Sequence, residues 1–220
     1  MLYMGVRSLL LAFALASLAC KPIAKTSNPD LATAVRHKDV LEMERVLEEM
    51  VDAKAATDEE REYAYKQLER TKDDGSAAYA LARAGIVGRY AESKGLKALW
   101  LIKEIEGLAL ESIARDPDFE DAAARRMLGT LYVLAGDHTE KGDSEVGLEL
   151  LEELVDGDAE NPRNRLRLAE GYIFLGDPDP ALEHLCFAHS KQDELRPSEQ
   201  RLLKRLFGDV GGIDEAGCGG

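Results

Sequence analysis

Residues 161–190 read NPRNRLRLAEGYIFLGDPDPALEHLCFAHS, and this stretch decides the fold. Two segments of helical apolar periodicity flank a short run rich in Gly, Asp and Pro. Asn161-Pro162 and Asp177-Pro178 each place a capping side chain before a proline that suits the first turn of a helix. The stretch therefore predicts helices over 163–175 and 179–191. Because the loop between them is short, the two helices must pack antiparallel.

The small and large side chains of this helix pair follow the spacing of tetratricopeptide repeats. A large–small pair on the first helix is followed by an aromatic residue, and the second helix carries a small–large–small set. One unit earlier the first half of the pattern recurs, with six extra residues that fall in the polar loop 136–143. The residues predicted to make the repeat packing are Leu128, Gly129, Tyr132, Gly147, Leu168, Ala169, Tyr172, Ala181, Leu185 and Ala188.

The rest of the chain has the same helical character. Aromatic residues make up only 6% of the 220 residues, and no segment alternates apolar and polar residues for long enough to form a strand. Further helices are expected near 38–52, 58–72, 76–93, 96–115, 119–135, 144–156 and 198–207. The predicted fold is all-α, with antiparallel helix pairs stacked as a tetratricopeptide-like α-solenoid.

The first twenty residues, MLYMGVRSLLLAFALASLAC, have the pattern of an export signal. Arg7 precedes an uncharged run from Ser8 to Ala19, which is too short to span a bilayer. The segment ends in a sequence similar to a bacterial lipobox, so cleavage before Cys20 and lipidation of its thiol are expected. The expected location is the bacterial cell envelope, lipid-anchored and facing the periplasm. The alternative is a secreted protein cut near Ala19.

Five segments are expected along the chain. They are a signal peptide (1–19), a lipidated tether (20–37), an N-terminal helical pair (38–75), a tetratricopeptide-like array (76–208) and a Gly-rich tail (209–220). Lys and Arg number 28 against 42 Asp and Glu, which gives a net charge of -14. This charge argues against a nucleic-acid partner and against electrostatic adhesion to anionic lipid, so membrane attachment is expected through the lipid anchor alone.

Four short segments resemble a known family. They are RMLGTLY (126–132), KGD (141–143), GLELL (147–151) and LAEGY (168–172). Together they resemble the T-component family of TRAP transporters, which are periplasmic lipoproteins built of tetratricopeptide-like helix pairs. The resemblance covers about residues 76–190. It implies a periplasmic substrate-binding protein as partner, a cleft for a small apolar or organic-acid ligand, and homo-oligomers. Gly142 and Asp143 mark the implied partner loop.

Two cysteines remain after the expected lipidation of Cys20. In an oxidising periplasm, Cys186 and Cys218 could form a disulfide that pins the tail to the last repeat. The enclosed loop would contribute about 3 kcal/mol in the chain-entropy model. The alternative is a buried Cys186 and a free thiol in the tail. No metal site is expected, because His184, Cys186 and His189 point in different directions on one helix.

Clusters of carboxylates are the other candidates for a catalytic or metal-binding role. Acidic residues gather at 48–52, 58–60 and 116–121, and such groups are typical of helix N-termini and solvated helix faces. No Gly-rich phosphate loop, nucleophile elbow or His-Glu-x-x-His motif is present in the sequence. The sequence therefore predicts neither an enzyme nor a cofactor.

The helix expected at 96–115 is apolar on nearly all sides, and it contains Trp100, the single tryptophan. One interpretation makes it the central core helix of the array. The other makes Leu99, Trp100 and Ile102 the wall of a ligand cleft. A ligand carrier requires an enclosed apolar cavity near Trp100. A scaffold requires exposed polar and aromatic residues instead.

Two functions follow. The first is an accessory component of a TRAP-type solute transporter, which docks a periplasmic binding protein or binds a small apolar or organic-acid ligand. The second is a tetratricopeptide scaffold lipoprotein that holds envelope proteins together in an assembly complex.

Overall fold

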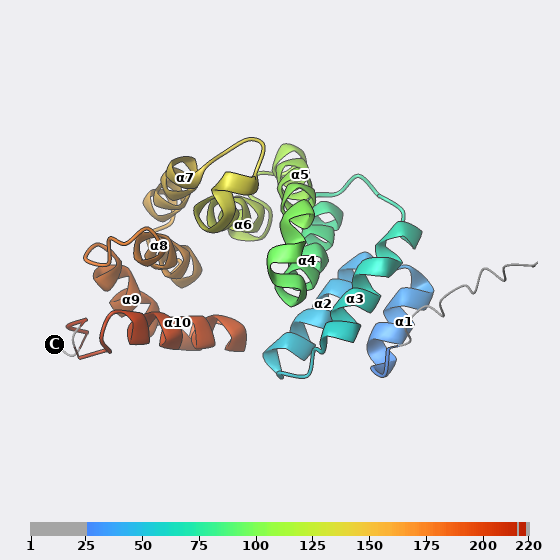
Figure 1. Ribbon diagram of the computed structural model, residues 1–220, viewed down its shortest axis with the longest axis horizontal. Helices are drawn as coiled ribbons and strands as arrows, with labels where there is room; N and C mark the ends of the chain where they lie inside the picture. Colours follow the sequence, from blue (N-terminus) through green and yellow to red (C-terminus); the bar gives the residue numbers. More distant parts are fainter. Residues whose placement is uncertain (1–25, 215, 219–220) are drawn as a thin grey trace, which may run out of the picture.

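The structure is a computed structural model that describes residues 26–214 and 216–218 (Figure 1). This part of the chain contains ten α-helices and no strand, so the all-α prediction is confirmed. The helices are α1 (Pro29–His37), α2 (Val40–Asp52), α3 (Asp58–Gln67), α4 (Ala77–Lys94), α5 (Leu99–Arg115), α6 (Phe119–Ala135), α7 (Ser144–Gly157), α8 (Pro162–Phe174), α9 (Ala181–Ser190) and α10 (Pro197–Asp209). Four short 3-10 turns, η1 (Leu68–Arg70), η2 (Gly95–Ala98), η3 (Gly136–His138) and η4 (Gln192–Glu194), complete the elements.

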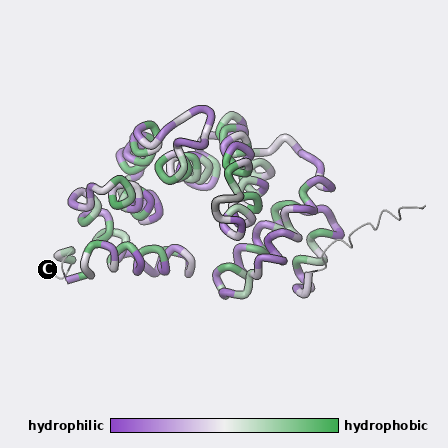
Figure 2. Tube along the Cα trace, viewed as in Figure 1, coloured by the Kyte–Doolittle hydropathy of each residue, from purple (hydrophilic) through white to green (hydrophobic). Residues whose placement is uncertain are grey.

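The helices follow an arc that returns on itself (Figure 1). Helices α4, α6 and α8 lie toward the middle of the view, α5 and α7 lie outside them, and α10 brings the end of the chain back to α2. From α4 to α9 the helices pair most closely with a neighbour in sequence: α4 with α5, α6 with α7, and α8 with α9. Figure 2 shows hydrophobic and hydrophilic residues mixed along every helix, as amphipathic helices require.

The chain before residue 38 is more structured than expected. The tether predicted over 20–37 is wrong for its last nine residues, which form α1. Asn28 caps this helix by accepting from two backbone N–H groups, Pro29 occupies its first turn, and Leu31 and Ala34 are buried. The Asn-Pro pair that begins α8 therefore also begins α1. The pair predicted over 38–75 is present as α2 and α3, and α1 adds a third helix before it.

The other predicted helices lie close to their observed bounds, with differences at the ends. The helix expected over 58–72 ends in η1, and the helix expected at 96–115 begins with η2. Three residues near the start of α6, Glu120, Asp121 and Ala122, have positive φ, so its regular right-handed part follows Ala122.

Glycines allow α6 and α7 to pack at short range. A Cβ atom at Gly147 would lie 2.6 Å from the backbone nitrogen of Val133 and 2.8 Å from the carbonyl oxygen of Gly129. A side chain at Gly129 would in turn meet Leu151. Ten residues were predicted to make the repeat packing. Nine of the ten are buried, and Tyr172 is half-buried.

Replacing Gly147 by Ala should therefore destabilise the protein by about 1–3 kcal/mol, because the added methyl cannot fit between α6 and α7. Gly107→Ala is the matched control, since nothing lies within 4 Å of its Cβ position in the middle of α5. The control should gain about 0.5–1 kcal/mol from helix propensity. Urea unfolding of both variants measures the difference. Equal changes in the free energy of unfolding for the two variants would contradict the close packing of α6 on α7.

The arc is closed by polar contacts between α10 and α2. Glu48 forms ion pairs with Arg89 of α4 and with Arg196, which precedes α10. The backbone N–H of Ser198 donates to a carboxylate oxygen of Asp52 at 2.8 Å. Arg201 donates to the carbonyl oxygens of Val51 and Asp52. In the described part of the chain no buried hydrophobic cluster joins α2 to α10. Ion pairs and hydrogen bonds of charged groups therefore hold these two helices together.

A second carboxylate at this junction titrates near neutral pH. Burial raises the pKa of Glu44 to about 7, and the neighbouring Glu48 carboxylate adds to the effect. Glu120 also raises this pKa, whereas Arg196 and Arg89 lower it. A raised pKa in the folded state means that the folded protein holds this proton more tightly than the unfolded chain. Stability from this group is complete at low pH and is lost as the pH rises through 7.

Glu44→Gln removes this titration. The variant should match the wild type at about pH 4, below the ordinary pKa of the carboxyl, and melt at a higher temperature at about pH 8, by about 2–4 °C for each kcal/mol gained. Thermal unfolding followed by circular dichroism over this pH range measures the effect. Glu49→Gln, an exposed position on the same helix, is the control. A Glu44→Gln variant with the pH profile of the wild type would contradict the raised pKa.

Candidate functional site

Two of the three residues predicted to wall a ligand cleft are exposed side chains. Leu99 is 41% exposed and Trp100 is 55% exposed, while Ile102 is half-buried. The interpretation of this segment as a core helix is wrong for the first turn of α5, although Leu101 and Ile105 of the same helix are buried. Two of the three predicted wall residues thus face solvent.

Trp100 belongs to an aromatic cluster on the surface. Its ring stands edge-on to Tyr65 with 5.9 Å between centroids, and Tyr65 stacks on Tyr90 at 4.5 Å. The Tyr65 hydroxyl donates to Glu104, and the ammonium group of Lys94 lies over the Tyr90 ring. These contacts hold the rings in a fixed arrangement, and the Trp100 side chain remains more than half exposed to solvent.

The predicted partner loop is fixed by a buried carboxylate. Glu106 of α5 is 2% exposed, and its two oxygens accept the backbone N–H groups of Glu140 and Lys141, each at 2.7 Å. The Tyr132 hydroxyl donates to the same carboxylate at 3.0 Å. Gly142 lies directly against the Tyr132 ring, where no side chain would fit.

Asp143, the other residue assigned to the partner loop, caps α7. Its side chain accepts from the backbone N–H groups of Glu145 and Val146. Gly142 and Asp143 therefore each have a structural role in this loop.

Exposed hydrophobic side chains lie at the helix ends that form one edge of the array, which we call the apolar edge. Of the eight large hydrophobic residues that are exposed in the described part of the chain, six lie at helix ends on this edge. The apolar edge consists of Leu99, Trp100, Leu134, Val146, Phe174 and Leu175.

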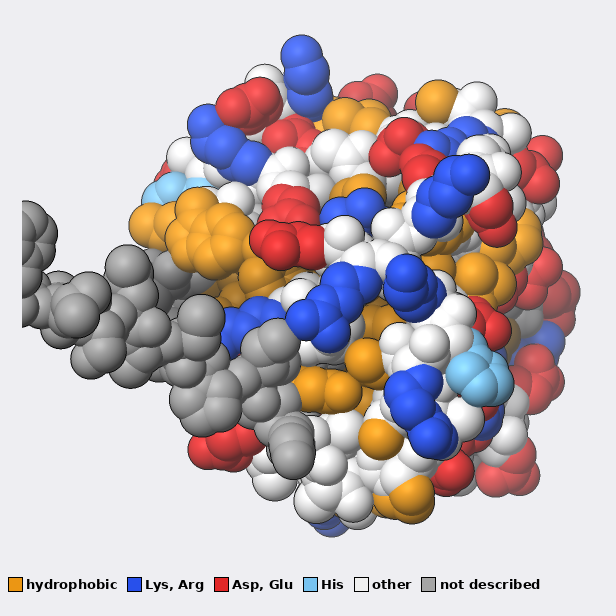
Figure 3. All heavy atoms as spheres, turned by 90° about the vertical axis from the view of Figure 1, so that its right-hand side faces the viewer, with side chains coloured by type: hydrophobic (Ala, Val, Ile, Leu, Met, Phe, Trp, Pro, Cys, Tyr) orange, Lys and Arg blue, Asp and Glu red, His pale blue; other side chains and the backbone are white. Residues whose placement is uncertain are grey.

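Contacts between helix ends show why these six residues share an edge. Lys103, one turn after Trp100, pairs with Glu140 of the loop between α6 and α7. The end of α6 meets the start of α7, where Gly136 lies against Ser144. The last turn of α8 packs on α7 through Gly171 against Leu148. In Figure 3, which views the end of the molecule that carries the N-terminal helices, hydrophobic side chains gather in patches bordered by charged ones.

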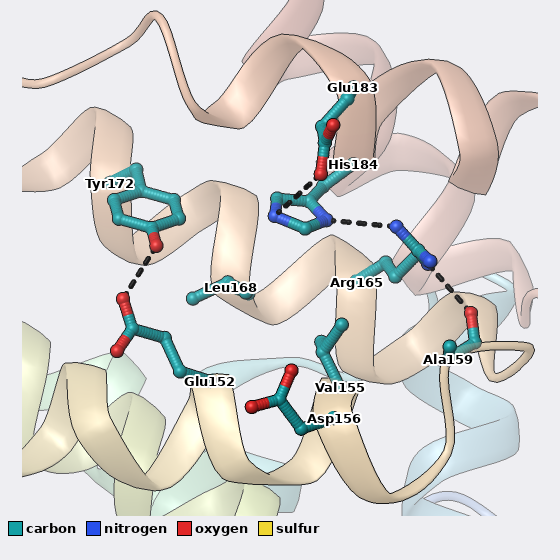
Figure 4. Close-up of a pocket in the computed structure, with 9 residues that line it drawn as sticks. All are labelled: Glu152, Val155, Asp156, Ala159, Arg165, Leu168, Tyr172, Glu183 and His184. Atoms are coloured by element: carbon teal, nitrogen blue, oxygen red, sulfur yellow. Dashed lines mark hydrogen bonds and ion pairs between the residues drawn. The ribbon is translucent and has the colours of Figure 1, made fainter.

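A separate polar pocket lies between α7, α8 and α9 (Figure 4). It has a volume of about 450 Å³ and is open to solvent. Its lining residues are Glu152, Val155, Asp156, Ala159, Arg165, Leu168, Tyr172, Glu183 and His184.

The protonation of His184 follows from its neighbours in this pocket. The Arg165 guanidinium, which can only donate, lies 3.2 Å from Nδ1 of His184. Nδ1 is therefore the acceptor, and a neutral ring carries its proton on Nε2. Burial lowers the pKa of His184, and the positive charge of Arg165 acts in the same direction. The Tyr172 hydroxyl donates to Glu152 at 2.6 Å. Three carboxylates, together with Arg165, Tyr172 and His184, give the pocket a polar lining that suits a polar group.

Two of the three cysteines are joined. Cys186 of α9 and Cys218 form a disulfide across 32 positions of sequence, and Ala216 of the tail is buried beside α10. Cys20 lies outside the described residues. In the described residues no group of three or more His, Cys, Asp or Glu side chains is arranged to hold a metal ion.

Comparison with known proteins gives no relative. No protein-family model matches the sequence, and no curated protein matches it. None of the described helices is both long and apolar enough to cross a membrane.

Sequence reasoning missed the buried carboxylates. The acidic clusters were expected at helix N-termini or on solvated faces. Glu60 does lie in the first turn of α3, but it is buried and accepts hydrogen bonds from Thr26 and Ser27. Glu48 is buried and ion-paired, so a solvated face is wrong for it. Glu106 and Glu170 are buried as well. A single sequence carries little signal for such burial, because the partners lie on other helices.

Removing the disulfide should cost about 3–4 kcal/mol, since the bond closes a loop of 32 residues. Cys218→Ser tests this by chemical unfolding under non-reducing conditions. Adding a reductant to the wild type should produce the same loss and should leave the variant unchanged. If reductant has no effect on the wild type, the bond does not stabilise the protein.

Proposed function

We propose that this chain is a lipid-anchored helical-repeat protein of the bacterial envelope that docks another protein through the apolar edge. The observation that supports this proposal is the gathering of Trp100, Phe174 and four aliphatic residues at one edge of an otherwise charged surface. Exposed apolar patches of this kind mark protein interaction sites. Tryptophan is also the residue type most enriched among the energetic centres of protein interfaces.

Docking explains this edge better than ligand carriage does. A carrier of an apolar ligand would enclose Trp100 in a cavity, whereas its side chain is more than half exposed. The pocket between α7 and α9 is polar and open, so it does not supply that cavity. Of the two functions considered from the sequence, protein docking is therefore the one we propose.

The partner follows from the resemblance to TRAP T-components, which suggests a periplasmic substrate-binding protein. The expected export signal and lipobox support an encounter in the periplasm. A scaffold role in an envelope assembly complex is the second candidate, and the same apolar edge would serve it.

The test measures binding of the purified substrate-binding protein from the TRAP transporter of the same organism. Trp100→Ser and Phe174→Ser should each weaken binding at least tenfold, because each removes a large apolar contact. Leu41→Ser is the matched control, since Leu41 is 44% exposed but lies on α2, away from the apolar edge. Isothermal titration calorimetry of the detergent-free Cys20→Ser chain gives the affinities.

Two outcomes would overturn parts of the proposal. If the wild type does not bind the substrate-binding protein, the transporter role is wrong. A photo-crosslinking side chain at position 100 in cells would then identify an envelope partner or exclude one. If Leu41→Ser weakens binding as much as Trp100→Ser does, the apolar edge is not the docking surface.

A further inference from the structure

The polar pocket between α7, α8 and α9 brings three carboxylates to one hollow (Figure 4). Glu152 and Asp156 are one turn apart on α7, and Glu183 belongs to α9. The volume of about 450 Å³ lies within the range of small-molecule sites, about 300–1,000 Å³. The buried side chains of Val155 and Leu168 add apolar surface to the lining. The hollow therefore has the size and the mixed lining of a site for a small organic ligand.

The carboxylates of the pocket are available to a ligand. In the described part of the chain, no lysine or arginine forms an ion pair with any of them. Glu152 accepts a hydrogen bond from the Tyr172 hydroxyl at 2.6 Å, and this donor is neutral. Glu183 is an exposed residue, whose carboxylate lies 3.7 Å from the ring of His184. A cation that enters the pocket would thus not have to displace another cation.

Arg165, the single arginine among the lining residues, is held by other groups. Its Nε donates to the carbonyl oxygen of Ala159 at 2.7 Å, and its guanidinium lies 3.2 Å from Nδ1 of His184. The guanidinium also stacks over the Phe187 ring, 4.3 Å from the centroid. Three negative charges therefore stand against one positive charge, which leaves the pocket with a net charge of -2. This charge attracts a cationic ligand.

His184 supplies a free hydrogen-bond donor on the buried side of the pocket. The residue is 7% exposed. Because Nδ1 accepts from Arg165, the neutral ring carries its proton on Nε2. Among the described residues Nε2 forms no hydrogen bond, since its 3.7 Å contact with Glu183 is too long for one. A buried donor without an acceptor is costly, and an oxygen atom of a ligand would satisfy it.

These groups fit an organic cation rather than a metal ion. In the part of the chain that the structure describes, no three His, Cys, Asp or Glu side chains converge as metal ligands. A primary ammonium group does not need such convergence, because it presents three separate N–H donors. Its hydrogen bonds to carboxylates are charge-assisted, which makes them about twice as strong as bonds between neutral groups.

We propose that this pocket binds a ligand that carries both a primary ammonium group and an oxygen acceptor. Glu152 and Asp156 accept from the ammonium group, and Nε2 of His184 donates to the oxygen. A free amino alcohol and a lysine residue of another protein share this chemistry. None of the six residues of the apolar edge lines the pocket, so this site and the docking function can fail separately.

The experiment uses two probes, 5-aminopentan-1-ol for a free amine and N-acetyl-lysine methylamide for a lysine residue. Isothermal titration calorimetry of the Cys20→Ser chain at constant ionic strength separates a site from general attraction of cations to a chain of net charge -14. At least one probe should show saturable binding at one site, with a Kd on the order of 1 mM or tighter. The neutral analogue 1,5-pentanediol should bind about tenfold more weakly or not at all.

Variants of the carboxylates test the position of the site. Glu152→Gln and Asp156→Asn should each weaken binding about fivefold, because each removes one charge and keeps the size of the side chain. Gln at position 152 still offers an oxygen to the Tyr172 hydroxyl, so the packing of α7 on α8 is kept. Glu149→Gln is the matched control, since it makes the same change at an exposed position of α7 outside the pocket.

Each outcome supports the site or overturns it. Saturable binding of either probe supports it, and the probe that binds more tightly identifies the source of the ammonium group. Absence of saturable binding by both probes would overturn the proposal. So would equal binding of 1,5-pentanediol, or wild-type affinity in both Glu152→Gln and Asp156→Asn. A loss in Glu149→Gln as large as the loss in Glu152→Gln would place any binding elsewhere. Far-UV circular dichroism confirms that each variant is folded before it is compared.

Discussion

A buried carboxylate must be paired, and four glutamates that meet this condition hold distant parts of this chain together. Glu48, Glu60, Glu106 and Glu170 are each less than a tenth exposed. Leaving any of them without partners would cost several kcal/mol, so each one determines where its donors lie. Each of the four accepts from at least one donor on another helix or in a loop, so these side chains fix how distant segments lie relative to one another.

The hydrophobic core alone would not give this arrangement. Its largest cluster joins α1 to α5, and another joins α8 to α10. Between these ends the return of α10 to α2 rests on Glu48 and Asp52 with their arginine and backbone donors. Hydrophobic contact fixes neighbouring helices, because apolar burial is additive and has no direction. Ion pairs fix helices that are far apart in sequence, because each carboxylate accepts from particular donors.

Local features of the fold could be predicted from the sequence, since they depend on residues close in the chain. The helices after residue 38 were expected with small errors at their ends, because Asn, Asp, Ser and Thr caps and proline positions are local signals. The first helix was missed although Asn28-Pro29 has the same pattern as Asn161-Pro162. Asn28-Pro29 follows closely on the expected export signal. Its position therefore favoured a polar tether over a helix.

The candidate sites were harder to predict because their character depends on tertiary neighbours. Trp100 and Leu101 are adjacent in an apolar run, yet one is exposed and the other is fully buried. Periodicity cannot separate them where a helix is apolar on nearly all sides. In contrast, the disulfide was among the alternatives, because only two cysteines remained to form it.

The apolar edge and the packed interior use different parts of the helices. The apolar edge is made of helix ends, where side chains project beyond the packed pairs and can be apolar without disturbing them. The interior is made of helix sides, where a charge must be matched by a partner. Glu106 joins the two, since one buried carboxylate holds both the loop beside the apolar edge and the Tyr132 hydroxyl of α6.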